Sequence, residues 1–459
     1  MVHSQACDRC HSLKALCLPG PAGNCYRCYR LHHKCTFSRR RGKRGPKPRL
    51  LTPSPSQSSN DKASETSLSD DVPRDETITQ NRSTQEPTLA TIPHHETLLM
   101  RISVSTALGI CSFFSFGPQL SMEMYRIIRA RVADAPLLLL RPYVAVSRVF
   151  LRCNANETPC SNTDWSACAS ALQTLRNAEI MKPEHIGSFL ALGMSLVTFH
   201  RLISGISAST ICRFTLSLVR PYYYANQLSD SDSMELMCLI FLDTTQSLFR
   251  ARVPVIEYKV RDPFRVDQHA GLCGSLLPLL YQVCLLAAAM KTRKGKNIPA
   301  ISFDKLKEEL QAWSPNPLPC ALERFSDEET LLLITQANVH RAGALLYLHR
   351  LRYPFGENDE EAEELSKTII TEMEYCLNVV GQFPPNMTLI LLFAGAEVRH
   401  KVGRQRILFL VSQILGSSFY PFIANLRLFL WRVWTGRDQG KARYLSLLFE
   451  EDPELSIPL

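Results

Sequence analysis

The sequence predicts two folded parts of different kinds, a small cysteine-rich head and a large all-α body, with a disordered linker between them. Three observations carry this prediction. Six of the 16 cysteines lie between Cys7 and Cys35. Residues 51–95 hold 15 Ser or Thr and five Pro, and only eight of the 45 are hydrophobic. Residues 96–459 repeat apolar side chains at helical spacing in long stretches.

The clustered cysteines form an internal repeat. Two triplets share the spacing CxxCx6C, and together they comprise Cys7, Cys10, Cys17, Cys25, Cys28 and Cys35. No apolar run precedes them, so we expect no secretory signal and a reducing compartment, where clustered thiols bind metal more often than they form disulfides. Zinc takes four ligands in a tetrahedron, so six thiolates hold two zinc ions only if two of them bridge both metals. So short a head cannot build an apolar core, and we expect its folding to depend on the metal.

The positive charge of the chain is concentrated in the same region. The formal net charge is +9, yet residues 1–50 alone hold 12 Lys or Arg and one acid, Asp8. The remainder is close to neutral. Residues 39–49 (RRRGKRGPKPR) are the densest run, and their Gly and Pro residues favour an extended chain. A basic head on a near-neutral body indicates a module that meets a polyanion.

The segments ACDRCHSLKALC and NCYRCYRLHHKCTF resemble the fungal Zn₂Cys₆ binuclear-cluster transcription factors. The run RRRGKRGPKPR is similar to the basic extension in regulators of aflatoxin-type secondary-metabolite gene clusters. The resemblance implies two zinc ions per chain, with Cys7 and Cys25 as the bridging ligands. It also implies that Lys14 contacts bases of CGG-like triplets in the major groove of double-stranded DNA. A lysine can donate to the O6 and N7 acceptors of guanine.

Other bases of the head are candidates for contacts to DNA phosphates. These are Arg9, Arg27, Arg30, Lys34, Arg39, Arg40, Arg41, Lys43 and Arg44. The run at 39–49 also has the composition of a nuclear localisation signal. Leu13 and Leu16 stand where bases are common in the family, so a second hypothesis stays open. Under it, the head is a zinc-stabilised protein-interaction unit whose DNA contacts are weakened or lost.

We therefore expect four segments. Residues 1–37 form the Zn₂Cys₆ DNA-binding domain, and residues 38–50 form a basic arm and nuclear localisation signal. Residues 51–95 form a disordered linker, because so polar a stretch does not offset its ordering entropy. Residues 96–459 form an all-α regulatory or activation domain. The linker lacks a heptad pattern, so a homodimer would use the helical body.

Within the body, residues 119–132, 186–203, 234–249 and 330–351 show helical periodicity, and we expect prolines such as Pro221 and Pro278 to separate helices. Residues 270–290 carry no charge over 21 positions. That length could span a bilayer, but Pro278 and Gln282 within it favour a buried core helix, and we expect no membrane contact. The acidic residues 357–364 (ENDEEAEE) are expected to be a solvated helix start.

No catalytic signature is present: HExxH, GxSxG, GxGxxG and GxxxxGK[ST] are all absent from the sequence. Ten further cysteines are scattered without ligand spacing and are expected to be buried small hydrophobes. The sequence thus predicts a nuclear DNA-binding transcription factor, with transcriptional coregulators as partners, that regulates a secondary-metabolite gene cluster and is not an enzyme.

Overall fold

The computed structural model confirms a cysteine cluster followed by an all-α body. The chain divides into two units, Met1–Thr84 and Gln85–Leu459. The described residues are 7–12, 25, 28, 33–38, 106–155, 157, 160–178, 183–203, 208–228, 233–292, 300–315, 319–415, 420–441, 444 and 445. The predicted linker at 51–95 and the basic run at 39–49 lie outside them.

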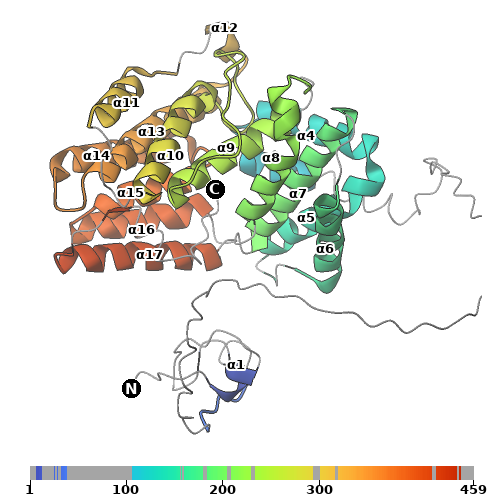
Figure 1. The fold of residues 1–459 in the computed structure, drawn as a ribbon, viewed down its shortest axis with the longest axis horizontal. Coiled ribbons are helices and arrows are strands. Elements are labelled where there is room, and N and C mark those ends of the chain that lie inside the picture. The colour runs from blue at the N-terminus through green and yellow to red at the C-terminus, as the bar shows by residue number, and fades with distance from the viewer. Residues whose placement is uncertain are drawn as a thin grey trace, which may run out of the picture. The chain divides into compact units, whose positions relative to one another are not determined.

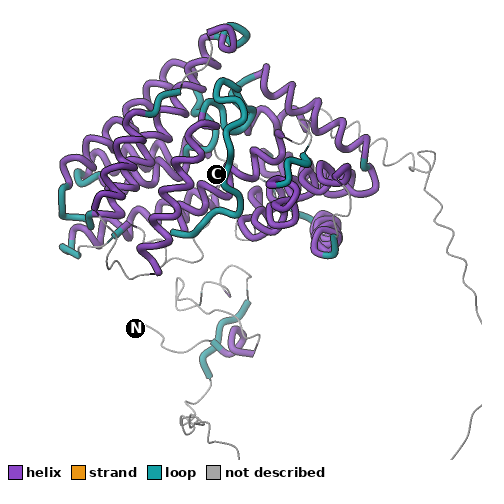
Figure 2. Tube along the Cα trace, turned by 45° about the horizontal axis from the view of Figure 1, so that its top comes forward, coloured by secondary structure: helices purple, strands orange, loops and turns teal. Residues whose placement is uncertain are grey.

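Helices account for the regular structure of the described chain, and Figure 2 shows no strand there. The head has one helix, α1 (Asp8–Ser12). The body contains α4 (Pro118–Asp134), α5 (Pro136–Asn154), α6 (Asn162–Arg176), α7 (Ile186–Ile203), α8 (Ala208–Tyr224), α9 (Ser233–Arg250), α10 (Leu277–Thr292), α11 (Ala300–Ala312), α12 (Pro319–Leu322), α13 (Asp327–Arg352), α14 (Asp359–Val380), α15 (Thr388–Glu397), α16 (Lys401–Leu415) and α17 (Tyr420–Asp438), with the 3₁₀ turns η3 (Pro183–His185) and η5 (Cys273–Leu276).

Local sequence explains where several of these helices begin. Ser326 precedes α13, and its hydroxyl accepts a hydrogen bond from the N–H of Glu329, whose carboxylate accepts one from the N–H of Ser326. Ser161 and Asp164 form the same reciprocal pair at the start of α6. Each such cap contributes about 1 kcal/mol. The four periodic segments all form helices, confirming that part of the prediction.

Prolines do not separate the helices everywhere. Pro221 lies within α8, and Pro142 lies within α5. Pro278 is the second residue of α10, a position where the missing N–H is not needed by the helix. The expectation that Pro221 lies between helices is wrong, because it falls in the last turn of α8 and the helix ends three residues later.

The body has two groups of helices joined by α9. Helix α7 packs against α5, α6 and α8, while α13 packs against α14, α11 and α15. Helix α9 contacts α7 and α8 on one side and α10 on the other. Figure 1 shows α4 to α8 gathered on one side of α9, and α10 to α17 on the other. The junction between the two groups is therefore inside one continuous core.

Two described helices are long and apolar enough to cross a membrane by length and composition alone, Pro183–Ile203 and Cys273–Thr292. In the first, 72% of the apolar window is buried, and in the second 44% is. Helix α10, which forms most of the second, buries Leu280, Val283 and Cys284. A core helix of a soluble protein passes the same test, and the expectation of no membrane contact stays a prediction.

A buried ion-pair network fastens the ends of three helices in the second group. Arg350 of α13 is fully buried, and its Nε and Nη2 donate to Glu397 of α15 at 2.8 and 2.7 Å. Its Nη2 also donates to Asp359 at 2.6 Å. Asp359 begins α14 and contacts Arg399 as well. The expectation of a fully solvated helix start is wrong for Asp359, whose side chain is 11% exposed.

Candidate metal centre

The repeat in the cysteine sequence is also a repeat in structure. Helix α1 begins directly after Cys7, and the N–H of Cys10 donates to the Sγ of Cys7 at 3.4 Å. In the second half the N–H of Cys28 donates to the Sγ of Cys25 at 3.3 Å. In each CxxC motif, the backbone amide of the second cysteine thus points toward the sulfur of the first cysteine. Such amides stabilise thiolate charge, which a metal ligand carries.

The two halves bring their sulfur atoms together. Cys7, Cys25, Cys28 and Cys35 offer Sγ atoms that all lie within 4.8 Å of one another. The Sγ of Cys7 lies 3.6 Å from that of Cys25 and 3.7 Å from that of Cys28. The Sγ of Cys10 lies 3.7 Å from that of Cys25. Four of these five cysteines are at most 1% exposed, and Cys35 is partly buried.

These separations fit a shared metal ion. Two thiolates bound to one tetrahedral zinc at roughly 2.3 Å lie about 3.8 Å apart. The observed 3.6 and 3.7 Å are close to that edge length, and much longer than the roughly 2.05 Å of a disulfide. All five thiols are free. The four-cysteine cluster can therefore hold a metal ion, and its all-sulfur donor set is one that zinc prefers.

The thiols affect one another's ionisation. Burial raises the pKa of Cys25, but hydrogen bonds from Cys28, Cys7 and Cys10 outweigh it, and the pKa falls to about 6. Burial and the neighbouring Cys25 and Cys7 raise the pKa of Cys28 to about 12. Without a cation, thiolates this close cannot all be charged, because like charges raise each other's pKa. A bound metal ion removes that conflict by supplying the missing positive charge.

A contact that sequence reasoning missed ties the head together. The carboxylate of Asp8 accepts hydrogen bonds from the N–H and the hydroxyl of Ser38 at 2.9 and 2.7 Å, and the N–H of Asp8 donates to the carbonyl of Thr36 at 2.8 Å. These bonds join the first helix to the residues that follow the last cysteine. Asp8 is the single acid among residues 1–50, which is the one sequence signal that could have indicated its role.

Few of the predicted DNA-contacting residues lie in the described part of the head. Arg9, on α1, and Lys34, just before Cys35, are both exposed. His33 is exposed too, and the four-sulfur group does not include it. The other DNA-contact candidates lie outside the described residues: Lys14, Arg27, Arg30, Arg39, Arg40, Arg41, Lys43 and Arg44. The predicted metal ligand Cys17 lies outside them as well.

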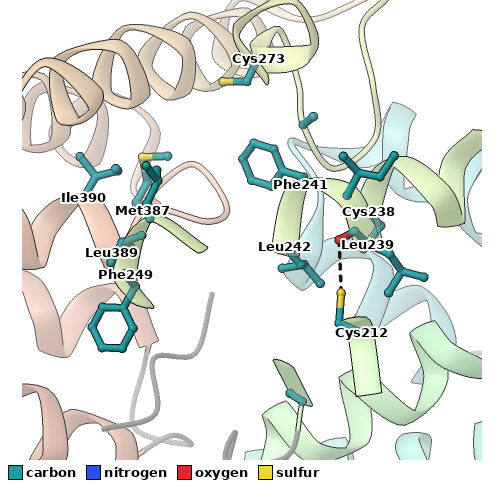
Figure 3. Close-up of a cluster of buried hydrophobic side chains, with 14 of the residues drawn as sticks. Cys212, Cys238, Leu239, Phe241, Leu242, Phe249, Cys273, Met387, Leu389 and Ile390 are labelled. Carbon is teal, nitrogen blue, oxygen red and sulfur yellow. Dashed lines mark hydrogen bonds between the residues drawn. The ribbon is translucent and has the colours of Figure 1, made fainter. Parts of the chain in front are cut away.

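The cysteines of the body are of a different kind. In the described chain, groups of three or more potential ligands that could hold a metal ion were found in the head alone. The thiol of Cys212 donates to the carbonyl of Leu239 at 3.2 Å, and Cys238 and Cys273 lie among apolar side chains (Figure 3). Burial raises the pKa of Cys238 to about 12. These thiols are neutral core groups, as the sequence predicts.

Comparison with known proteins places the body in a family. A family model described as "Fungal specific transcription factor domain" matches residues 109–457. No curated protein and no solved structure gives a match. The matched region is the helical body and does not include the cysteine head, so the two lines of observation are independent of each other.

Proposed function

The chain belongs to the fungal specific transcription factor domain family, and from this premise we propose that it is a nuclear, sequence-specific regulator of transcription by RNA polymerase II. The family is one of transcription factors and not of enzymes. Membership of this family implies DNA binding and a function in the nucleus. The cysteine cluster supports DNA binding as well, because it can hold metal and lies beside the exposed basic residues Arg9 and Lys34.

The head holds two zinc ions in this proposal, with Cys7 and Cys25 as the bridging ligands. The geometry supports that assignment. Cys7 and Cys25 belong to the four-sulfur group, and both also interact with Cys10, which is outside that group. A second ion would therefore share Cys7 and Cys25 and take Cys10 and Cys17 as its other ligands. Six thiolates then fill the eight positions that two tetrahedral zinc ions require.

Lys14 contacts the DNA bases in this proposal, and the other basic residues of the head contact DNA phosphates. It lies in the stretch after the first CxxC, where the resemblance to Zn₂Cys₆ proteins puts a lysine that contacts a CGG-like triplet. Arg9 and Lys34 are exposed and free to reach phosphates from the folded head. Phosphate contacts add affinity that depends on salt, and base contacts add sequence preference.

The rest of the chain has supporting roles. Residues 38–50 are the proposed nuclear localisation signal and residues 51–95 the proposed linker. The body carries homodimer and coregulator contacts, and its helices α16 and α17 expose Phe409 and Trp431, which are 55% and 61% accessible. The similarity of residues 39–49 to a basic extension supports a target among secondary-metabolite gene clusters.

A selection from random duplex sequences, using the full zinc-loaded chain, tests the proposal. We expect enrichment of CGG-like triplets. Lys14→Ala should abolish the preference, while the matched variant Lys34→Ala should weaken binding to all sequences alike and reduce the salt slope by about one. Retained zinc with no preference for any duplex would contradict the proposal. It would favour the second candidate, the interaction unit suggested by Leu13 and Leu16.

A further inference from the structure

A cavity of about 230 Å³ lies at the junction of the two helix groups of the body. The described residues 106–114, just before α4, are helical. Residues 112–115, at the end of that helix, and Arg201, near the end of α7, line the cavity from the first group. The loop from Gly381 to Asn386 after α14, and the last turns of α16, line it from the second. An occupant of this cavity would touch both groups at once.

Among the described residues that line the cavity, Arg201 is the one with a charged side chain. Its guanidinium lies over the ring of Phe114, 5.0 Å from the centroid. Its Nε is shut off from solvent and has no hydrogen-bond partner, and no ion pair of Arg201 occurs in the described chain. Burial lowers its pKa to about 10, so it is still a cation at neutral pH.

Several other arginines of the body have a carboxylate partner. Arg131 pairs with the buried Glu235 at 3.0 Å, and Arg213 pairs with Asp243 at 2.8 Å. Arg350 pairs with Glu397 and Asp359. Arg201 is partly exposed, yet its Nε is shut off from water, and desolvation of a cation without an anion is costly because it is not repaid by attraction. Arg252 and Arg341 also have a buried Nε without a partner, but their Nη atoms donate to Ser209 and to the carbonyl of Trp313. The side chain of Arg201 has neither an ion pair nor a hydrogen bond among the described residues.

The described groups around Arg201 do not include an anion. The thiols of Cys212 and Cys238 are near enough to influence Arg201, but burial raises the pKa of both, and they are neutral. Nearby His269 is neutral as well, because burial lowers its pKa to about 3. The side-chain amide of Asn386 already donates to the carbonyl of His269 at 3.2 Å.

The remaining lining is mixed, because Ser112, Ser115, Gln382, Asn386, Thr388 and Gln413 add polar surface beside apolar and aromatic side chains. Phe113, Phe114 and Phe383 line the cavity together with Pro384 and Pro385. A pocket with an aromatic and proline-rich wall, several neutral polar groups and one cation fits a small ligand with an apolar body and one anionic group. Its volume is below the roughly 300–1,000 Å³ of pockets for drug-sized ligands, which indicates a small molecule of one or two rings or a short acyl chain.

We propose that this cavity binds a small organic carboxylate, with the carboxylate on the Arg201 guanidinium and the apolar body among the phenylalanine and proline side chains. A guanidinium binds a carboxylate through two parallel hydrogen bonds, which gives both strength and orientation. The occupant would link α7 to the loop after α14. This inference does not rest on DNA recognition, and it can fail while the proposed function holds.

Titration calorimetry on the full zinc-loaded chain tests the charge requirement. The probes are benzoate, octanoate and 2-naphthoate, with 2-naphthamide as the neutral match for the last. We expect at least one carboxylate to bind, and 2-naphthoate to bind at least tenfold more tightly than 2-naphthamide. Binding by none of the three carboxylates at millimolar concentration, or equal affinity for 2-naphthoate and 2-naphthamide, would overturn the proposal.

Variants of Arg201 locate the binding. Arg201→Met should lose the tenfold preference, and Arg201→Lys should keep part of it because it retains the charge. Arg220→Met is the matched control, since Arg220 is exposed on α8 and does not line the cavity. It should leave the affinity unchanged. Unaltered affinity for 2-naphthoate in Arg201→Met would place the ligand elsewhere and overturn the assignment.

Thermal unfolding gives a readout that a merely structural arginine would not produce. Without ligand, the unfolding midpoint of Arg201→Met should equal or exceed that of the parent chain, because an uncompensated cation is removed. A saturating carboxylate should raise the midpoint of the parent chain and leave that of Arg201→Met unchanged. A carboxylate that raises both midpoints equally would contradict the proposal.

Discussion

The head and the body of this chain bury ionisable groups in opposite ways. In the head, four sulfur atoms that become negative when they ionise lie within 4.8 Å of one another; they belong to Cys7, Cys25, Cys28 and Cys35. In the body, Arg350 is surrounded by carboxylates of opposite charge from two other helices. A bound cation would neutralise the sulfur atoms of the head, whereas buried Arg350 has its counter-charges within the body. The side chain of Arg201 has neither an ion pair nor a hydrogen bond among the described residues, and it lines the cavity that we propose as a ligand site.

Metal removal should separate the two regions most strongly. Structural zinc contributes roughly 10–16 kcal/mol to zinc-finger peptides, more than a short head can replace by packing. A strong chelator should therefore release the metal and unfold the head. The body should keep its helical circular dichroism signal, because its helices pack in a core of their own. Metal release measured with a zinc-sensitive dye, followed by far-ultraviolet circular dichroism, checks both halves of this expectation.

A pair of cysteine variants controls that experiment. Cys25→Ser should lower the zinc content, because Cys25 belongs to the four-sulfur group. Cys212→Ser should leave it unchanged, because Cys212 is a core thiol bonded to a backbone carbonyl. If chelation also abolished the helical signal of the body, the contrast between a metal-dependent head and a self-sufficient body would be lost.

The next largest effect should come from breaking the buried ion pair of the body. Glu397→Ala leaves Arg350 buried with Asp359 as its remaining carboxylate partner. Removing one partner of a buried pair costs about 3–5 kcal/mol. We expect that loss in the free energy of unfolding, measured with urea, and an unchanged zinc content in the head.

An exposed ion pair serves as the control for this loss. Lys305 and Glu309 lie on α11, with side chains 77% and 44% exposed. Exposed pairs contribute about 0–1 kcal/mol, so Glu309→Gln should change the free energy of unfolding by about 0.5 kcal/mol or less. Equal losses in Glu397→Ala and Glu309→Gln would show that the buried network does not stabilise the body.

The same contrast explains which features sequence reasoning could find. The predicted metal ligands lie within 29 residues and repeat one spacing, so the sequence alone predicts a metal site. The helices at 186–203 and 330–351 follow from their apolar period. Arg350 and Glu397 are 47 positions apart, and nothing in either segment indicates the other. Asp359 has the sequence appearance of a solvated helix start, and only the packing of α13, α14 and α15 shows it to be a counter-ion.

The smallest effect we predict is acid lability of the body through two buried histidines. His269 and His340 are 8% and 2% exposed, and the Nε2 of each lacks a hydrogen-bond partner in the described chain. Burial lowers their pKa values to about 3 and about 4. The unfolded chain takes up these protons near pH 6.5, whereas the folded chain does not. Their contribution is therefore complete above pH 6.5 and is lost as the pH falls toward 4 and 3.

Between pH 7 and pH 5.5 this linkage should lower the free energy of unfolding by roughly 1.4 kcal/mol per histidine. Urea unfolding of chelator-treated protein at the two pH values measures it, because the metal-free head then adds no pH dependence of its own. His340→Gln should remove about half of the loss, while His185→Gln should remove none, since His185 is exposed on η3. A pH dependence that His340→Gln does not alter would mean that acid acts on other groups of the body. The body's sensitivity to acid would then not come from its buried neutral histidines, and this part of the contrast with the thiolates of the head would be lost.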